Sequence, residues 1–123
     1  MMPYINDTAY DQALTWIATN GTRLDICSQE PATYAEATST YTLGSKSSIS
    51  IGSATNGDSS GRKVVVAAIT DGSVTGTGTA THYAITNASS LLVATGALAA
   101  SQAVTTGNTF TTAAIDITIA DAT

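Results

Sequence analysis

Positive charge is missing from half of this chain, because residues 64–123 contain no Lys and no Arg. The whole chain of 123 residues has four basic and nine acidic side chains, which gives a formal net charge of −5. Proteins that bind nucleic acids need clustered Lys and Arg against the phosphates, so we expect no nucleic acid among the partners. Charged side chains also protect sheet edges, so a sheet built from this half needs covering partners or Thr-rich and Ser-rich faces.

Cysteine and long apolar runs are scarce as well. The single Cys27 has no second cysteine for an internal disulfide, which is compatible with folding in a reducing cytoplasm. No apolar run approaches the ~20 residues of a membrane helix, and no segment after Met1 has the pattern of a secretory signal. We therefore expect no membrane contact and no export of the chain.

What the chain does contain is typical of one β-rich domain. Its length suits a single domain with one core. Thr is abundant, and its branched Cβ packs well on a pleated sheet. Short apolar stretches recur at intervals of about ten residues in the second half, which is typical of antiparallel sheets. The prediction is a mainly β protein, an antiparallel β-sandwich or barrel, with one short N-terminal helix.

The single domain divides into an N-terminal arm (1–6), a helix (7–20) and a β body (22–123). The helical face is predicted from residues spaced three or four apart: Tyr10, Ala13, Leu14 and Ile17. We expect Asp7 or Thr8 to cap the helix and Gly21 to end it in a left-handed conformation.

Within the body, the alternation of apolar and polar residues predicts a series of strands. Asp71-Gly72 predicts a two-residue hairpin turn, and Gly76 to Gly78 predicts a bulge. Turns are also expected at residues 87–90 and at Gly107-Asn108. The predicted strands are 23–28, 46–51, 62–70, 74–86, 91–98, 99–104 and 109–120, and residues 34–37 are predicted to form a short helical turn.

Residues suited to catalysis or metal binding are few. His82 is the only histidine, and it is the only base that could serve Cys27 as a nucleophile. The loop with Asn56, Asp58, Ser59 and Ser60 has one carboxylate, whereas a calcium site usually has several. We therefore predict no catalytic, cofactor-binding or metal-binding residue, no cofactor, and a protein that is not an enzyme.

The aromatic and apolar residues of the first half are the candidates for partner contacts, since aromatic side chains carry much of the energy of protein–protein binding. The same tyrosines and tryptophan could instead cap the core. The candidates are Tyr4, Ile5, Trp16, Tyr34 and Tyr41.

Several stretches resemble small virion proteins of tailed bacteriophages and prophages. The resemblance lies in the helix followed by TRLDICSQEP (22–31) and TYAEAT (33–38), and in RKVVVAAITDG (62–72) and GTATHYAIT (78–86). It covers most of the chain and brings no active site with it. It implies a structural protein of the phage particle, located in the virion and assembled in the cytoplasm of the bacterial host.

The leading hypothesis is a capsid decoration, or cement, protein that binds the outer capsid and stabilises it. Its partners would be the major capsid protein or other virion proteins, and it would form a homo-oligomer. One alternative is a structural component of the tail, the neck or a fibre attachment. An alternative of another class is a module that binds carbohydrates or the host surface.

Overall fold

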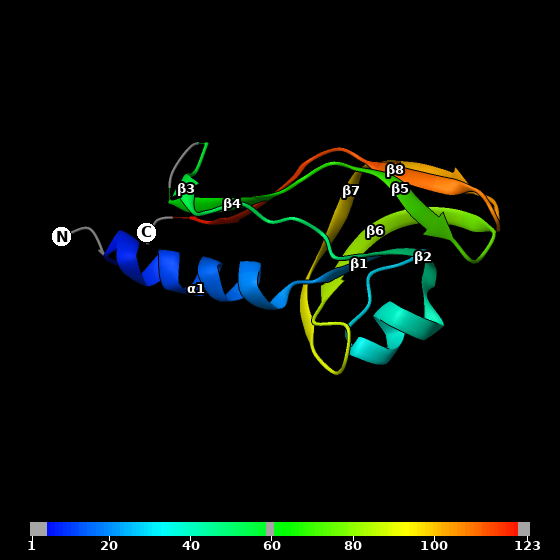
Figure 1. Cartoon of the computed structure of the whole chain (residues 1–123), viewed down its shortest axis with the longest axis horizontal. Coiled ribbons are helices and arrows are strands. Elements are labelled where there is room, and N and C mark those ends of the chain that lie inside the picture. Colours follow the sequence, from blue (N-terminus) through cyan, green and yellow to red (C-terminus); the bar gives the residue numbers. More distant parts are fainter. Residues whose placement is uncertain (1–4, 59–60, 121–123) are drawn as a thin grey trace.

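A computed structural model describes residues 5–58 and 61–120, which form two connected parts (Figure 1). The first part, the stalk, consists of helix α1 and a three-stranded sheet of order β3-β4-β9. The second part, the barrel, is a curled six-stranded sheet of order β7-β6-β1-β2-β5-β8. The helices and strands of both parts are, in chain order, α1 Asp7–Asn20, β1 Arg23–Cys27, the π-helix η1 Glu36–Thr40, β2 Thr42–Ser47, β3 Thr55–Asn56, β4 Arg62–Val66, β5 Ile69–Val74, β6 Gly78–Thr86, β7 Leu92–Val104, β8 Thr109–Thr112 and β9 Ile115–Ile119.

The strand pairs within both sheets are antiparallel, which confirms the prediction of a mainly β protein with an antiparallel, barrel-like body and a short N-terminal helix. Within the described residues, no helix has the length and hydropathy needed to cross a lipid bilayer.

Helix α1 begins and ends where the sequence predicts, but both of its caps differ from the prediction. Asn6 is the N-cap, and its side-chain oxygen accepts a hydrogen bond from the Thr8 N–H at 2.8 Å. Gly21 is not left-handed, since its φ is −79°. It is required for packing instead, because a Cβ there would lie 2.8 Å from both the Ile17 carbonyl oxygen and Ile85 Cγ2.

One long two-stranded ribbon joins the stalk to the barrel. The segment predicted as a single strand over 62–70 is divided into β4 and β5, and the last predicted strand is divided into β8 and β9. The two strands keep the same offset from Arg62, opposite Ile119, to Ile69, opposite Thr112, although residues 67–68 and 113–114 are not paired. The ribbon therefore enters the large sheet in the register of the small one, and the register shifts by one residue between Ile69 and Gly72.

The predicted hairpin at Asp71-Gly72 is wrong, because both residues lie inside β5. Strand β5 pairs with β2 and β8, not with the strand that follows it. Gly72 is needed there because any Cβ would overlap the ring of Phe110. The Asp-Gly sequence, which resembles a turn in its composition, is therefore explained by the space that the Phe110 ring needs beside Gly72.

Other predicted boundaries are partly right. The strand expected over 46–51 lies earlier, at Thr42–Ser47, and Ile49 and Ile51 pack against the core from irregular backbone. The predicted turns at Asn87 and Gly107 are confirmed. Asn87 Oδ1 accepts hydrogen bonds from three following N–H groups, and Gly107 has a φ of 91°.

Strand β1 lies in the middle of the barrel sheet and is buried on both faces. Leu24 and Ile26 point into the barrel interior, where Phe110 is the largest fully buried side chain. Cys27 belongs to a second, smaller cluster with Ala37 of η1, so the segment around η1 covers the outer face of the strand.

Candidate functional site

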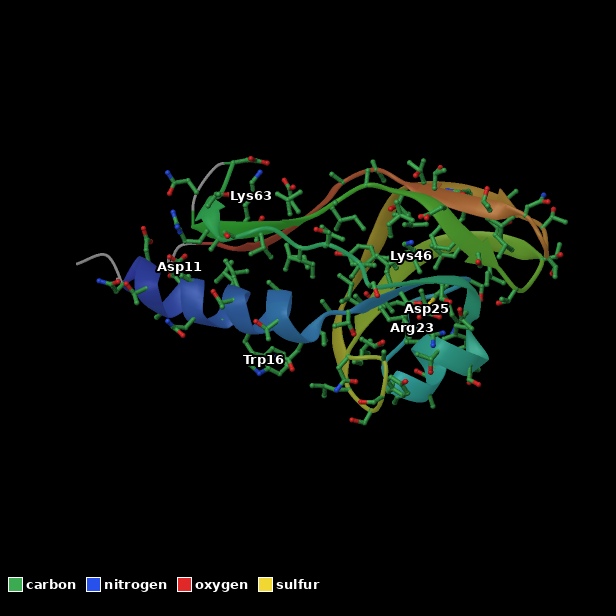
Figure 2. The ribbon with its side chains drawn as sticks, viewed as in Figure 1. Asp11, Trp16, Arg23, Asp25, Lys46 and Lys63 are labelled. Atoms are coloured by element: carbon green, nitrogen blue, oxygen red, sulfur yellow. The ribbon has the colours of Figure 1, made fainter. Side chains whose placement is uncertain are left out.

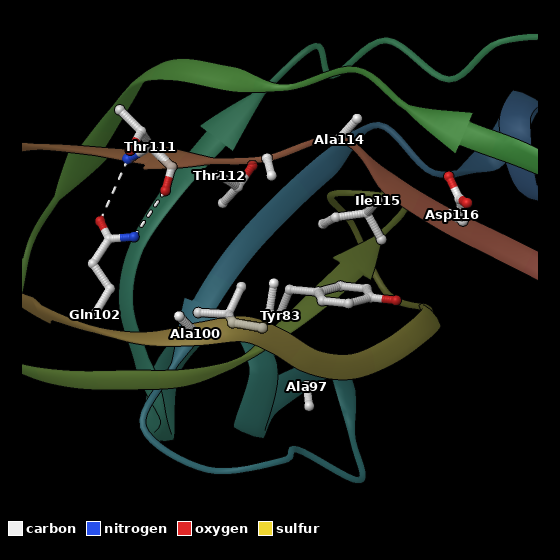
Figure 3. A pocket seen from close by; sticks show the side chains of 12 residues that line it. Tyr83, Ala97, Ala100, Gln102, Thr111, Thr112, Ala114, Ile115 and Asp116 are labelled. Carbon is white, nitrogen blue, oxygen red and sulfur yellow. Dashed lines mark hydrogen bonds between the residues drawn. The ribbon is translucent and has the colours of Figure 1, made fainter.

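The barrel does not close, and the two edges of its sheet are joined by one side chain. Gln102 of β7 donates a hydrogen bond from Nε2 to the Thr111 carbonyl oxygen at 2.8 Å (Figure 3). Its Oε1 accepts from the Thr111 N–H at 3.4 Å. These are the two bonds that a residue of a neighbouring antiparallel strand would exchange with Thr111. The amide of Gln102 therefore takes the place of a missing strand between β7 and β8.

A groove of about 460 Å³ follows this seam between the two edges. Cavities that hold only ordered water are much smaller, since one water takes up roughly 30 Å³ in the liquid. Asp116 is the one charged side chain of the lining, and five of the lining residues are alanines. The lining consists of Tyr83, Ala97, Leu98, Ala99, Ala100, Gln102, Thr111, Thr112, Ala113, Ala114, Ile115 and Asp116.

A wide bulge in β7 shapes one wall of the groove. His82 of β6 pairs with Ala97, but Ala80 pairs with Gln102. Residues 98–101 of β7 therefore have only Thr81 opposite them. Bulges bend a strand and interrupt its pairing, and this one lies where β7 lines the groove.

One buried polar atom in the lining of the groove has no hydrogen-bond partner in the described structure, and a tyrosine hydroxyl lies close by. Thr112 Oγ1 is buried and has no hydrogen-bond partner among the described residues. Tyr83 is 8% exposed, and burial raises the pKa of its hydroxyl, for which no bond is found in the described part of the chain. Its ring lies over Gly96, where a Cβ would be 2.7 Å from the hydroxyl oxygen. An unpaired buried hydroxyl such as that of Thr112 costs free energy, and it lies in a residue that lines the groove.

Two of the predicted contact residues, Trp16 and Ile5, are exposed. Trp16 is 48% exposed and lies on the side of α1 that faces away from the small sheet (Figure 2). Ile5 is 47% exposed, and Tyr4 lies outside the described residues. Trp16 and Ile5 are thus available to a partner, and their role as contacts stays a prediction.

The predicted tyrosines lie on the segment that covers β1. Tyr41 packs against the cluster of Cys27, Ala37 and Ala84. Tyr34 is half-buried, and its carbonyl oxygen accepts a hydrogen bond from Thr38 Oγ1 at 2.8 Å. Neither tyrosine lines the groove, and the structure does not bring either to the seam.

Cys27 and His82 are register partners on neighbouring strands, which sequence reasoning did not foresee. The Cys27 thiol is buried and its Sγ donates to the Ala37 carbonyl oxygen at 3.7 Å, while His82 Nδ1 lies 2.9 Å from the Thr81 hydroxyl. Burial, together with the nearby Asp25 carboxylate, raises the pKa of Cys27 to about 12. A nucleophilic thiol needs a lowered pKa, so this environment opposes thiolate formation.

The raised pKa of Cys27 predicts a loss of stability in alkali. The free thiol of the unfolded chain ionises near pH 9, whereas the folded one ionises near pH 12. The stabilisation is complete below about pH 9 and is lost as pH rises toward 12, at up to about 1.4 kcal/mol per pH unit. Urea unfolding at increasing pH should therefore show a shallower decline for Cys27→Ala than for the wild type. Tyr83→Phe removes another buried group with a raised pKa, so its decline in alkali should be shallower as well. Parallel declines in the wild type and Cys27→Ala would contradict the prediction.

All four basic side chains of the chain are in ion pairs. The pairs are Arg23–Asp25 at 2.8 Å, Lys46–Asp71 at 3.1 Å, Arg62–Asp11 at 2.8 Å, and Lys63 with Asp58 at 2.6 Å and Asp116 at 3.1 Å. The excess charge of the chain is therefore negative, with no free cation to offset it.

The loop considered for a cation binds the chain's own basic groups. Asp58 accepts from Lys63, and the Asn56 side-chain oxygen accepts from Arg62 at 2.6 Å. Ser59 and Ser60 lie outside the described residues. Across residues 5–58 and 61–120, no three His, Cys, Asp or Glu side chains gather closely enough to hold a metal ion.

The chain matches no protein-family model, no curated protein and no solved structure.

Proposed function

We propose that this chain is a structural protein of a phage virion, a capsid decoration protein that binds the outer capsid and stabilises it. The observation that carries the proposal is the unprotected edge of the barrel. Strand β7, Leu92–Val104, has 13 residues and pairs only with β6 among the described strands. It contains no charged residue and no proline.

Such an edge is a liability in a protein that works alone. Exposed edge strands present unpaired N–H and C=O groups, and soluble proteins protect them with charge, proline or short length. The bulge at residues 98–101 is the single device of this kind in β7. A long uncharged edge is favourable in a protein whose edge is covered by neighbours in an assembly.

The elongated shape supports a bridging role. The stalk side of the molecule presents Trp16 and Ile5, and the barrel contains the edge strand β7 (Figures 1 and 2). A protein that stiffens a shell by linking neighbouring subunits needs two separate contact surfaces. Several copies would act together as a homo-oligomer on the particle, with the major capsid protein or other virion proteins as partners.

The test is the copy number per particle, measured by quantitative mass spectrometry of purified virions, followed by binding of the purified protein to capsids that lack it. We expect a copy number typical of a protein that covers the whole capsid shell, well above the handful expected for a ring. We also expect Trp16→Ala to weaken capsid binding at least about tenfold, as for an aromatic hot spot. Gln12→Ala, an exposed change on the same helix, should bind as the wild type does.

Two other results would contradict the decoration role. A handful of copies per virion would favour the tail, neck or fibre-attachment alternative, because rings have few subunits. Binding of the protein to a glycan array, lost in Trp16→Ala, would favour a module for carbohydrates or the host surface.

A further inference from the structure

We propose that the groove at the seam is the acceptor for an extended segment of another protein, which inserts as a strand between β7 and β8 and completes the barrel. The segment would have small or β-branched side chains and a basic residue near the β9 end. This inference rests on the proposed function, since it takes the occupant to be a protein chain of the particle.

The width of the seam fits one strand. Neighbouring strands are about 4.8 Å apart, and a glutamine side chain plus one hydrogen bond bridges roughly two such spacings. The two bonds between Gln102 and Thr111 show that the edge of β8 already accepts a peptide-like amide in this position. A real strand would replace that amide and add further backbone bonds on both sides.

The small side chains that line the groove favour an extended backbone as its occupant over a bulkier group. Alanines 97, 99 and 100 on one wall and 113 and 114 on the other leave room for a backbone to approach closely. The floor offers Thr112 Oγ1, which is buried without a partner, and the hydroxyl of Tyr83. An inserted strand could bond to the Tyr83 hydroxyl directly. It could bond to Thr112 Oγ1 once the Thr112 side chain turned toward the groove, which would remove the cost of leaving that hydroxyl unpaired.

Charge indicates that the occupant comes from a different protein rather than from a second copy. Asp116 is the charged residue of the groove, and it shares Lys63 with Asp58. A second copy would bring a net charge of −5 and four cations that are all engaged in ion pairs. A segment from another protein with a free Lys or Arg matches the groove better.

The experiment uses the full chain and a synthetic nine-residue peptide of alternating Thr and Val with one terminal Lys. Binding is measured by titration, and its place by amide hydrogen exchange at Thr111 and the residues around it. We expect protection at both edges of the seam. The same peptide with Glu in place of Lys should bind at least about tenfold more weakly. Gln102→Ala should tighten binding about tenfold, because the competing amide is gone.

Two matched variants of β7 locate the site. Ala100→Trp fills the groove from an exposed lining position and should abolish binding. Ala103→Trp, on the same strand but outside the lining, should leave binding unchanged.

Three results would overturn the proposal. The first is the absence of protection at the seam with millimolar peptide. The second is equal binding of a peptide with N-methylated backbone, which cannot donate strand bonds and would indicate a pocket for side chains or small molecules. The third is self-association of the protein that is lost in Ala100→Trp but kept in Ala103→Trp, which would make a second copy the occupant.

The two proposals fail separately. If the peptide enters the seam but capsids do not bind the protein, the capsid role fails and the strand acceptor stands. If capsids bind Ala100→Trp as tightly as the wild type, the strand acceptor fails and the capsid role stands.

Discussion

Phe110→Ala is expected to lower the free energy of unfolding by about 3–5 kcal/mol, the usual cost of removing a buried phenyl ring. Phe110 is 1% exposed and is the largest fully buried side chain among the described residues. Its ring packs on Gly72 and Gly44, which have no side chains to move into the space. Because domains are stable by only about 5–15 kcal/mol, this one change removes a large share of the free energy of unfolding. Urea unfolding monitored by circular dichroism measures the effect.

The glycine beneath the ring provides a matched test of the same contact. A Cβ at residue 72 would overlap the Phe110 ring, so Gly72→Ala should cost about 1–3 kcal/mol by overpacking. In the double variant Gly72→Ala/Phe110→Ala the added methyl group enters the vacated space, so the two costs should not add. Strict additivity would show that the ring does not press on residue 72.

Arg23→Ala is expected to cost about 2–3 kcal/mol, because it leaves a carboxylate buried without its cation. Asp25 is fully buried in the central strand and accepts hydrogen bonds from Arg23 Nε at 2.8 Å, from the guanidinium at 3.0 Å and from Thr42 Oγ1 at 2.7 Å. The full cost of breaking a buried pair is about 3–5 kcal/mol, and the partly exposed Arg23 places this pair below that range.

Two comparisons separate burial from charge. Lys46→Ala breaks an exposed pair with Asp71 and should change stability by less than about 0.5 kcal/mol. Replacing both partners by apolar residues, as in Arg23→Met/Asp25→Leu, should recover most of the stability lost in Arg23→Ala. If the double variant is as unstable as the single one, the ion pair contributes more than the removal of a buried charge.

Local sequence patterns predicted the local elements and did not predict how those elements meet. The spacing of Tyr10, Ala13, Leu14 and Ile17 predicted α1, because the residues that a helix buries recur at its own period. Tyr10 and Leu14 are buried as expected, whereas Ala13 is exposed. Asp71-Gly72 has the composition of a turn, yet the requirement for glycine arises from Phe110, a residue almost forty positions later. Composition alone does not distinguish a glycine needed for φ from one needed for space.

The candidate site was beyond sequence reasoning for the same reason. Gln102, Thr111 and Thr112 are ordinary polar residues in strands, and nothing in their spacing indicates a groove. They become a site because the sheet curls until β7 faces β8 and then stops one strand short of closing. What the sequence did offer was the lack of Lys and Arg over residues 64–123, which predicted a sheet that needs covering partners or Thr-rich and Ser-rich faces.

The two-stranded ribbon has a mechanical consequence. Both strands of the ribbon run covalently between the stalk and the barrel, because β4 continues into β5 and β8 continues into β9. A pull along the ribbon is therefore carried by two covalent backbones side by side. The hydrogen bonds between the strands lie perpendicular to them and hold the two backbones together under that load. If the two ends of the molecule are held by different neighbours, the ribbon shares the tension between two backbones instead of one.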